Sequence, residues 1–149
     1  MHLLAATTGL IADGGEAVDL LQTPGEIVIL SAADSDLACL ANAQKQMGPE
    51  SASLRLANLM QLSHNMSVDL YAEKIVSKAS LVIVRLIGGV SYWPYGLEQI
   101  RSVAIQHSVA LIVIPGDDNP DLELMAYSTL PLEVVNRCWL YLLNSGVDN

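Results

Sequence analysis

The sequence contains no phenylalanine and few basic residues. Seven lysines and arginines stand against sixteen aspartates and glutamates, which gives a formal net charge of -9 over 149 residues. This sign is unfavourable for binding to a nucleic-acid backbone or to an anionic membrane surface, because both carry negative charge. We therefore expect no nucleic acid among the partners of this protein.

Long apolar runs and a secretory signal are also missing. No stretch approaches the roughly 20 apolar residues that are needed to cross a bilayer. The first residues, MHLLAATTG, lack the basic region with which a signal peptide begins. The sequence therefore predicts a cytoplasmic protein without a membrane span.

Residues and motifs that usually carry chemistry are scarce. The two cysteines, Cys39 and Cys138, lie far apart and within expected helices, which favours reduced, packed thiols over a disulfide or a metal site. The motifs GxSxG, HExxH and GxGxxG and the P-loop are absent. An autonomous catalytic site is not evident.

What the chain does have is apolar content. Hydrophobic residues make up 52% of the sequence and charged residues 15%, which is typical of a globular protein whose surface is partly meant for a partner. A chain of this length is close to the usual size of one domain. We expect residues 1–149 to form a single domain.

Five short apolar segments have the character of strands. Two of them, LVIVRL and VALIVI, are nearly continuous runs of valine, isoleucine and leucine, which is typical of parallel strands covered on both faces. The expected strands are His2–Thr7, Ile27–Ser31, Leu54–Met60, Leu81–Leu86 and Val109–Ile114.

Helical patterns lie between these strands. The expected helices are a short one at Glu16–Leu21 and longer ones at Asp34–Lys45, Ser67–Lys78, Pro94–His107 and Pro131–Asn144. Regular alternation of strand and helix predicts an α/β fold, with helices on both faces of a doubly wound parallel sheet. We expect a three-layer, Rossmann-like or flavodoxin-like domain with five parallel strands in the order 2-1-3-4-5.

In such a sheet, ligands bind outside the carboxyl ends of the strands. The loop after Leu86 is the leading candidate, because two glycines allow close backbone approach and three aromatic side chains offer an apolar wall. The alternative is that the rings fill the space between helix and sheet or pack against another domain. The candidate contacts are Gly88, Gly89, Ser91, Tyr92, Trp93 and Tyr95.

Other loops offer weaker candidates for proton transfer or metal binding. His64 directly precedes a helix, where it could act as a base or a metal ligand, or simply cap its neighbours. Asp117 and Asp118 lie in an oxygen-rich loop that suits a hard cation, or that is a solvated turn. Arg85 interrupts an apolar strand and, if buried, needs a partner such as Glu98 or an acidic loop residue.

The block ANLMQLSHNMSVDLYAEKIVSKASLVIVRLIGGVSYWPYGLEQI, from Ala57 to Ile100, resembles the N-terminal region of the aerobic cobaltochelatase large subunit, the CobN family. This family is related to the large subunit of magnesium chelatase. The resemblance continues through MHLLAATTG, GEIVILSAADSDLA and VALIVIPGDDNPDLEL, so that it covers practically the whole chain.

The resemblance implies a role in cobalamin biosynthesis. It implies an ATP-dependent complex that inserts cobalt into hydrogenobyrinic acid a,c-diamide, in which the large subunit holds the corrin and the metal. Two partner subunits would form the ATPase with ATP and magnesium, whereas no cofactor is expected in this region alone. Because family members are many times longer, the resemblance implies a domain that scaffolds the subunit or helps to enclose the tetrapyrrole, and that is not catalytic by itself.

A different function remains open from the residues alone. A freestanding flavodoxin-like domain could place Thr7, Thr8 and Gly9 against a phosphate. Trp93 or Tyr95 would then stack on the ring system of a flavin.

Overall fold

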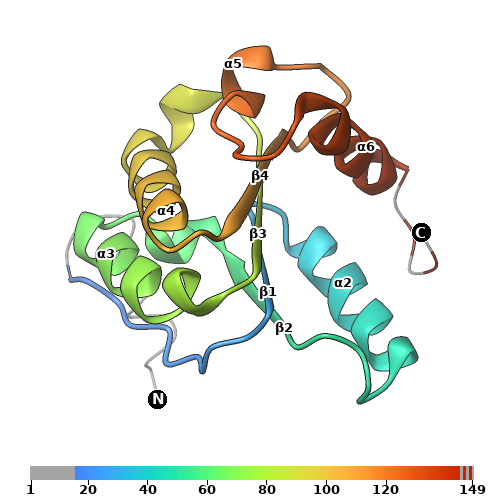
Figure 1. The fold of residues 1–149 in the computed structure, drawn as a ribbon, viewed down its shortest axis with the longest axis horizontal. Coiled ribbons are helices and arrows are strands. Elements are labelled where there is room, and N and C mark those ends of the chain that lie inside the picture. The colour runs from blue at the N-terminus through green and yellow to red at the C-terminus, as the bar shows by residue number, and fades with distance from the viewer. Residues whose placement is uncertain (1–15, 145, 147, 149) are drawn as a thin grey trace.

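The computed structural model describes residues 16–144, 146 and 148, and strands and helices alternate along them (Figure 1). The strands are β1 (Ile27–Ser31), β2 (Leu54–Asn58), β3 (Leu81–Leu86) and β4 (Ala110–Pro115). The α-helices are α2 (Asp34–Met47), α3 (Asn65–Lys74), α4 (Pro94–Gln106), α5 (Leu122–Met125) and α6 (Leu132–Leu143). Short 3-10 turns are η1 (Leu59–Leu62), η2 (Val76–Lys78) and η3 (Val90–Tyr92).

Within the described residues the sheet has four parallel strands in the order β2-β1-β3-β4. The predicted α/β class, the parallel pairing and the alternation with helices are confirmed. The predicted number of five strands is not confirmed, because the expected strand His2–Thr7 lies outside the described residues.

The predicted strand order was also wrong at Ile27–Ser31. That order paired this strand with His2–Thr7 at an edge, whereas β1 is central and pairs with both β2 and β3. The burial of β1 explains its place: Val28 and Leu30 are fully buried on one face and Ile29 is buried on the other. A strand whose two faces are both covered is favoured in the middle of a sheet. The chain therefore adds β2 on one side of β1 and β3 on the other, so the strand order reverses between β1 and β3.

Several element boundaries differ from the prediction. The expected strand ending at Met60 stops at Asn58, whose side chain accepts a hydrogen bond from the Met60 amide and starts the turn η1. The expected helix Ser67–Lys78 begins two residues earlier and breaks at Ile75 into η2. Strand β3 has the predicted bounds.

The expected helix Glu16–Leu21 is absent. Instead, this segment runs along α3 and the edge of the sheet, held by bonds from Val18 N to Ser67 Oγ (2.7 Å) and from Gln22 Nε2 to the Leu56 carbonyl oxygen (2.8 Å). Leu21 has a φ of 58°, which a helix does not allow. Contacts with residues distant in sequence therefore replace the local helical pattern.

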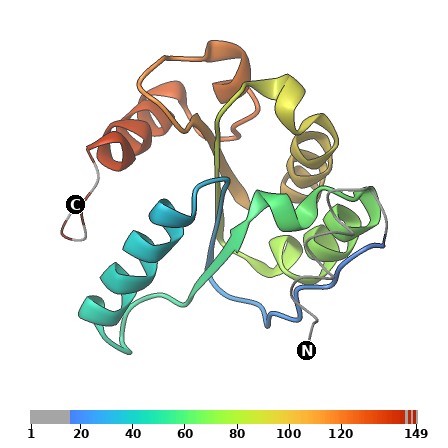
Figure 2. The same ribbon diagram turned by 180° about the vertical axis from the view of Figure 1, so that it is seen from behind.

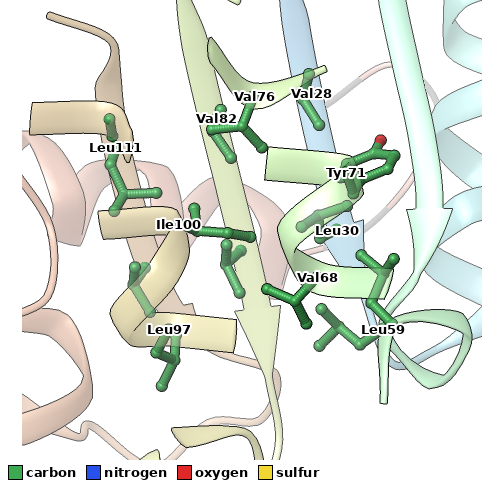
Figure 3. Close-up of a cluster of buried hydrophobic side chains, with 14 of the residues drawn as sticks. Val28, Leu30, Leu59, Val68, Tyr71, Val76, Val82, Leu97, Ile100 and Leu111 are labelled. Carbon is green, nitrogen blue, oxygen red and sulfur yellow. The ribbon is translucent and has the colours of Figure 1, made fainter. Parts of the chain in front are cut away.

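The helices cover the sheet in pairs. Figures 1 and 2 show α3 and α4 on one side of the sheet and α2 and α6 on the other. The side chains that point toward α3 and α4 form the larger core cluster, in which residues of β1, β3 and β4 meet those of both helices (Figure 3). The residues labelled there are Val28, Leu30, Leu59, Val68, Tyr71, Val76, Val82, Leu97, Ile100 and Leu111.

The opposite face carries a smaller cluster, which α6 covers with Val135 and Trp139 over Ile83 and Ile112. Helix α2 contributes less, because none of its residues is fully buried, whereas α3 and α4 each bury four. No helix within the described residues has the length and apolar character needed to cross a membrane.

Candidate functional site

The loop between β3 and α4 carries the aromatic residues that the sequence analysis selected. Its two glycines have positive φ angles, 105° at Gly88 and 78° at Gly89, a conformation that other residues rarely adopt. A Cβ atom added to Gly89 would lie 3.3 Å from the carboxylate of Asp121. The glycine pair therefore shapes a tight turn beside the loop that follows β4.

Trp93 is part of the protein core. Its side chain is 7% exposed, and its indole Nε1 donates a hydrogen bond of 3.0 Å to the carbonyl oxygen of Leu62. The ring lies against Gly96, where an added Cβ would come within 2.0 Å of Trp93 Cε2. The ring is therefore occupied by packing between α4 and the loop after β2, and its faces are not available for stacking on a flavin.

The two tyrosines of the loop have different surroundings. The hydroxyl of Tyr95 donates a 2.8 Å hydrogen bond to Asp69 Oδ1, which joins α4 to α3 and raises the pKa of Tyr95 above its usual value. Tyr92 is 50% exposed and its hydroxyl lies 3.3 Å from the sulfur of Met60. Ser91 is exposed beside it. Of the three rings, Tyr92 is the one that presents most of its surface to a partner.

His64 is the N-cap of helix α3. Its Nδ1 accepts a 3.1 Å hydrogen bond from the backbone amide of Met66, and its carbonyl oxygen accepts one from Val68. An N-cap acceptor satisfies an amide that has no partner inside the helix. The structure thus gives His64 the capping contact that was the alternative to a chemical role.

Replacing His64 by alanine is expected to lower the free energy of unfolding by about 1 kcal/mol, because the Met66 amide loses its acceptor. His64→Asn supplies a capping oxygen and should retain most of the stability. Urea unfolding of both variants measures this. Equal losses in both would contradict the capping role, and lost chelatase activity in a fully stable Asn variant of a complete large subunit would show a chemical one.

Oxygen atoms of the acidic loop after β4 accept hydrogen bonds from nearby backbone amides and from helix α6. Asp117 Oδ1 accepts a hydrogen bond from the Asn119 amide (3.1 Å), and its carbonyl oxygen accepts one from Trp139 Nε1 (3.0 Å). Asp121 caps the short helix α5 through Leu124 N, while Asp118 is exposed. Together with Gly88 and Gly89, Asp117 and Asp121 line a cleft of about 230 Å³.

Arg85 has a partner that the sequence analysis did not identify. Its side chain is 9% exposed, and its Nη1 lies 2.7 Å from Asp36 Oδ1, in the first turn of α2. Asp36 Oδ2 in turn accepts a 2.8 Å hydrogen bond from the hydroxyl of Ser31. Neither Glu98 nor an acidic loop residue is paired with Arg85. The sequence did contain a signal for this pairing, because the acidic residue Asp36 lies just after β1, and β1 is the neighbour of β3, which carries Arg85.

A groove adjoins this polar group on the α2 and α6 side of the sheet. It has a volume of about 890 Å³ and is lined by apolar side chains from β1, α2 and α6. The polar and charged residues along it include Ser31, Ser35, Asp36, Gln46, Arg85 and Asp148. We call it the α2–α6 groove; its apolar lining includes Ile29, Leu40, Ala43, Met47, Tyr141 and Leu142. It lies where the strand order reverses, between β1 and β3, which is the usual ligand position in such sheets.

Two known proteins with similar sequences are subunits of aerobic cobaltochelatase. Aerobic cobaltochelatase subunit CobN of Sinorhizobium sp is 46% identical over 149 residues, which is 100% of this chain and 12% of the relative. The protein of the same name from Pseudomonas aeruginosa is 46% identical over 150 residues, with the same coverage. This chain is homologous to the N-terminal region of CobN.

A solved structure supports the CobN homology. The catalytic subunit of cobaltochelatase from Mycobacterium tuberculosis matches with a TM-score of 0.65 and 25% identity, over 83% of this chain and 9% of that chain. No family profile matches the sequence. The chain spans about an eighth of the length of the CobN relatives, so its similarity concerns one region of them.

The candidate metal ligands of this CobN-like region do not come together. His64 follows β2 and Asp117 follows β4, and these strands lie at opposite edges of the sheet with two strands between them. Three strand spacings separate the edges by about 14 Å. Among the described residues, no three histidine, cysteine, aspartate or glutamate side chains form a group that could hold an ion. For His64, Asp117 and Asp118, a role as ligand stays a prediction.

Proposed function

We propose that this chain serves as the N-terminal domain of a cobaltochelatase large subunit, where it packs against the rest of that subunit and helps to enclose the tetrapyrrole. The observation that carries the proposal is the 46% identity to CobN over the entire chain. The matched region covers the whole chain, so it includes the core, the loops and the surface.

In this proposal the activity belongs to the whole complex. The large subunit holds the corrin and the cobalt substrate, and ATPase subunits with ATP and magnesium drive insertion into hydrogenobyrinic acid a,c-diamide. Insertion requires deprotonation of the inner nitrogens of the macrocycle and removal of water from the ion, which call for bases and metal ligands around a large cavity. We assign those groups to the remainder of the subunit.

The chemistry of the described loops favours a structural role for this region. His64 caps a helix, and the indole of Trp93 is enclosed by Leu62 and Gly96. Large apolar side chains nevertheless remain on the surface, among them Met47 at 69% exposure and Met60 at 51%. Such side chains suit contact with another part of a larger protein.

The test is a split large subunit. A large subunit lacking the region homologous to residues 1–149 is assayed for cobalt insertion with its ATPase partners, alone and after addition of this chain. We expect at least a tenfold loss of activity on deletion and partial recovery when the chain is supplied separately. Full activity of the truncated subunit would rule out the proposed role, and circular dichroism of the truncated subunit controls for misfolding.

A further inference from the structure

The α2–α6 groove follows helix α2 along most of its length. The residues of α2 that line it include Asp36, Cys39, Leu40, Ala43 and Met47. The last four follow Asp36 by three, four, seven and eleven residues and therefore share one face of the helix. From Asp36 to Met47 this face extends for about 16 Å, at 1.5 Å per residue. The groove is therefore long, and three turns of a helix would match its length.

The walls of the groove leave apolar surface uncovered. Helix α2 buries none of its residues fully, although Leu40 packs on the same cluster as Ile29. At one end of the helix Met47 is 69% exposed, and on the opposite wall Tyr141 of α6 is 57% exposed. A helix that packs on a sheet normally buries an apolar stripe. The apolar stripe of α2 therefore stays partly exposed, most of all at Met47.

Arg85 marks one end of the groove with an unmet hydrogen bond. Its Nη1 is bonded to Asp36, but its Nε is buried and has no acceptor among the described residues. A buried donor without a partner costs about 1–3 kcal/mol. Because Arg85 also lines the groove, a segment bound there could place an oxygen acceptor beside the guanidinium.

We propose that the α2–α6 groove binds an apolar helical segment from the remainder of the large subunit, with an oxygen acceptor next to Arg85. This inference rests on the function proposed above and names the surface through which this region would be docked. Binding of a helix in an apolar groove is a common mode of recognition, in which residues spaced by three or four positions provide the anchors.

The length and charge of the groove favour this occupant. Its length and the apolar side chains on both walls fit a helical face better than a compact ligand, although Ser35, Gln46 and Asp148 also line it. The charges of Arg85 and Asp36 neutralise each other. The CobN relatives are about eight times as long as this chain, so most of their chain is available to supply the segment.

The experiment places a charge in the groove and a matched charge outside it. Ala43 lines the groove, whereas Ala38 is on the exposed side of the same helix. Arginine is a good helix former, so neither Ala43→Arg nor Ala38→Arg is expected to unfold α2. Binding of each chain to the truncated large subunit is measured by calorimetry, and we expect at least tenfold weaker binding for Ala43→Arg and no change for Ala38→Arg.

Met47→Arg tests the far end of the groove at an exposed position, in case Ala43→Arg disturbs the fold. Hydrogen exchange provides a second measurement. Amides of residues 36–47 should exchange at least tenfold more slowly in the complete subunit than in the isolated chain. Equal exchange rates, or equal binding by all three variants, would overturn the proposal.

Other occupants give different results. A dimer of the isolated chain that Ala43→Arg dissociates would identify a second copy in the groove, and a small molecule that copurifies and is lost in this variant would identify a ligand; either outcome overturns the assignment. The proposed function fails separately, through full activity of the truncated subunit. Lost activity on deletion with unchanged binding by Ala43→Arg would reject the groove alone.

Discussion

Replacing Trp93 by alanine is expected to lower the free energy of unfolding by about 3–5 kcal/mol, the usual cost of removing a large aromatic side chain from a core. The indole is 7% exposed and belongs to the larger core cluster. Its removal leaves a cavity beside Gly96 and deprives the Leu62 carbonyl oxygen of its donor. Chemical denaturation of the isolated chain measures the change.

Tyr92→Ala is the matched control for this prediction, since Tyr92 is the neighbouring aromatic residue and is 50% exposed. Its loss should change the stability by less than about 1 kcal/mol. If the loop contacts substrate or another domain through Tyr92, then in the complete subunit Tyr92→Ala should lower the activity more than Trp93→Ala does. Similar stability of the two variants would contradict the packing that the structure gives Trp93.

Gly96→Ala provides an independent test of the same contact. The new Cβ would overlap the indole ring, with the nearest atom at 2.0 Å. Since the ring is held by its bond to Leu62, the overlap cannot be relieved by a simple rotation. We expect a loss of stability of about 1–3 kcal/mol, typical of overpacking, although alanine is the better helix former.

The sequence was sufficient to predict elements whose signal is local. Strand β3 was predicted with its observed bounds because LVIVRL is an uninterrupted run of residues that favour a doubly covered strand. For His64 the sequence indicated a place just before a helix and left a capping role open beside a chemical one, and the structure gives it the N-cap position. Pro94 begins α4 as expected, because proline fits the first helical turn.

Local sequence patterns could not predict features that depend on contacts between residues far apart in the sequence. Arg85 and Asp36 are 49 residues apart, and only the pairing of β1 with β3 brings them together. The strand order could not be derived from apolar runs, since both edge and central strands have them. For the aromatic loop, the sequence left open whether a ring would face a ligand or the core, and for Trp93 the close packing of its ring against Gly96 decided the matter.

Replacing Asp36 by alanine is expected to lower the free energy of unfolding by about 3–5 kcal/mol, because it leaves the charge of Arg85 buried without a counterion. The guanidinium side chain is 9% exposed and its Nε already lacks an acceptor. The Ser31 hydroxyl would also lose its acceptor. Urea unfolding of the isolated chain measures the loss.

Asp34→Ala is the matched control, because Asp34 lies in the same first helical turn and carries the same charge. It therefore loses the same favourable interaction with the helix dipole, about 0.3–1 kcal/mol, together with an exposed hydrogen bond from Asn58. The difference between the two variants isolates the contribution of the buried pair. A difference below about 0.5 kcal/mol would show that Arg85 is solvated once Asp36 is removed.

The double variant Asp36→Leu with Arg85→Met separates the cost of an unpaired charge from the worth of the pair. Replacing a whole buried ion pair by apolar residues is often neutral or stabilising, so the double variant should regain most of the stability lost in Asp36→Ala. If it also binds the truncated large subunit more weakly, then the polar end of the α2–α6 groove serves recognition more than folding.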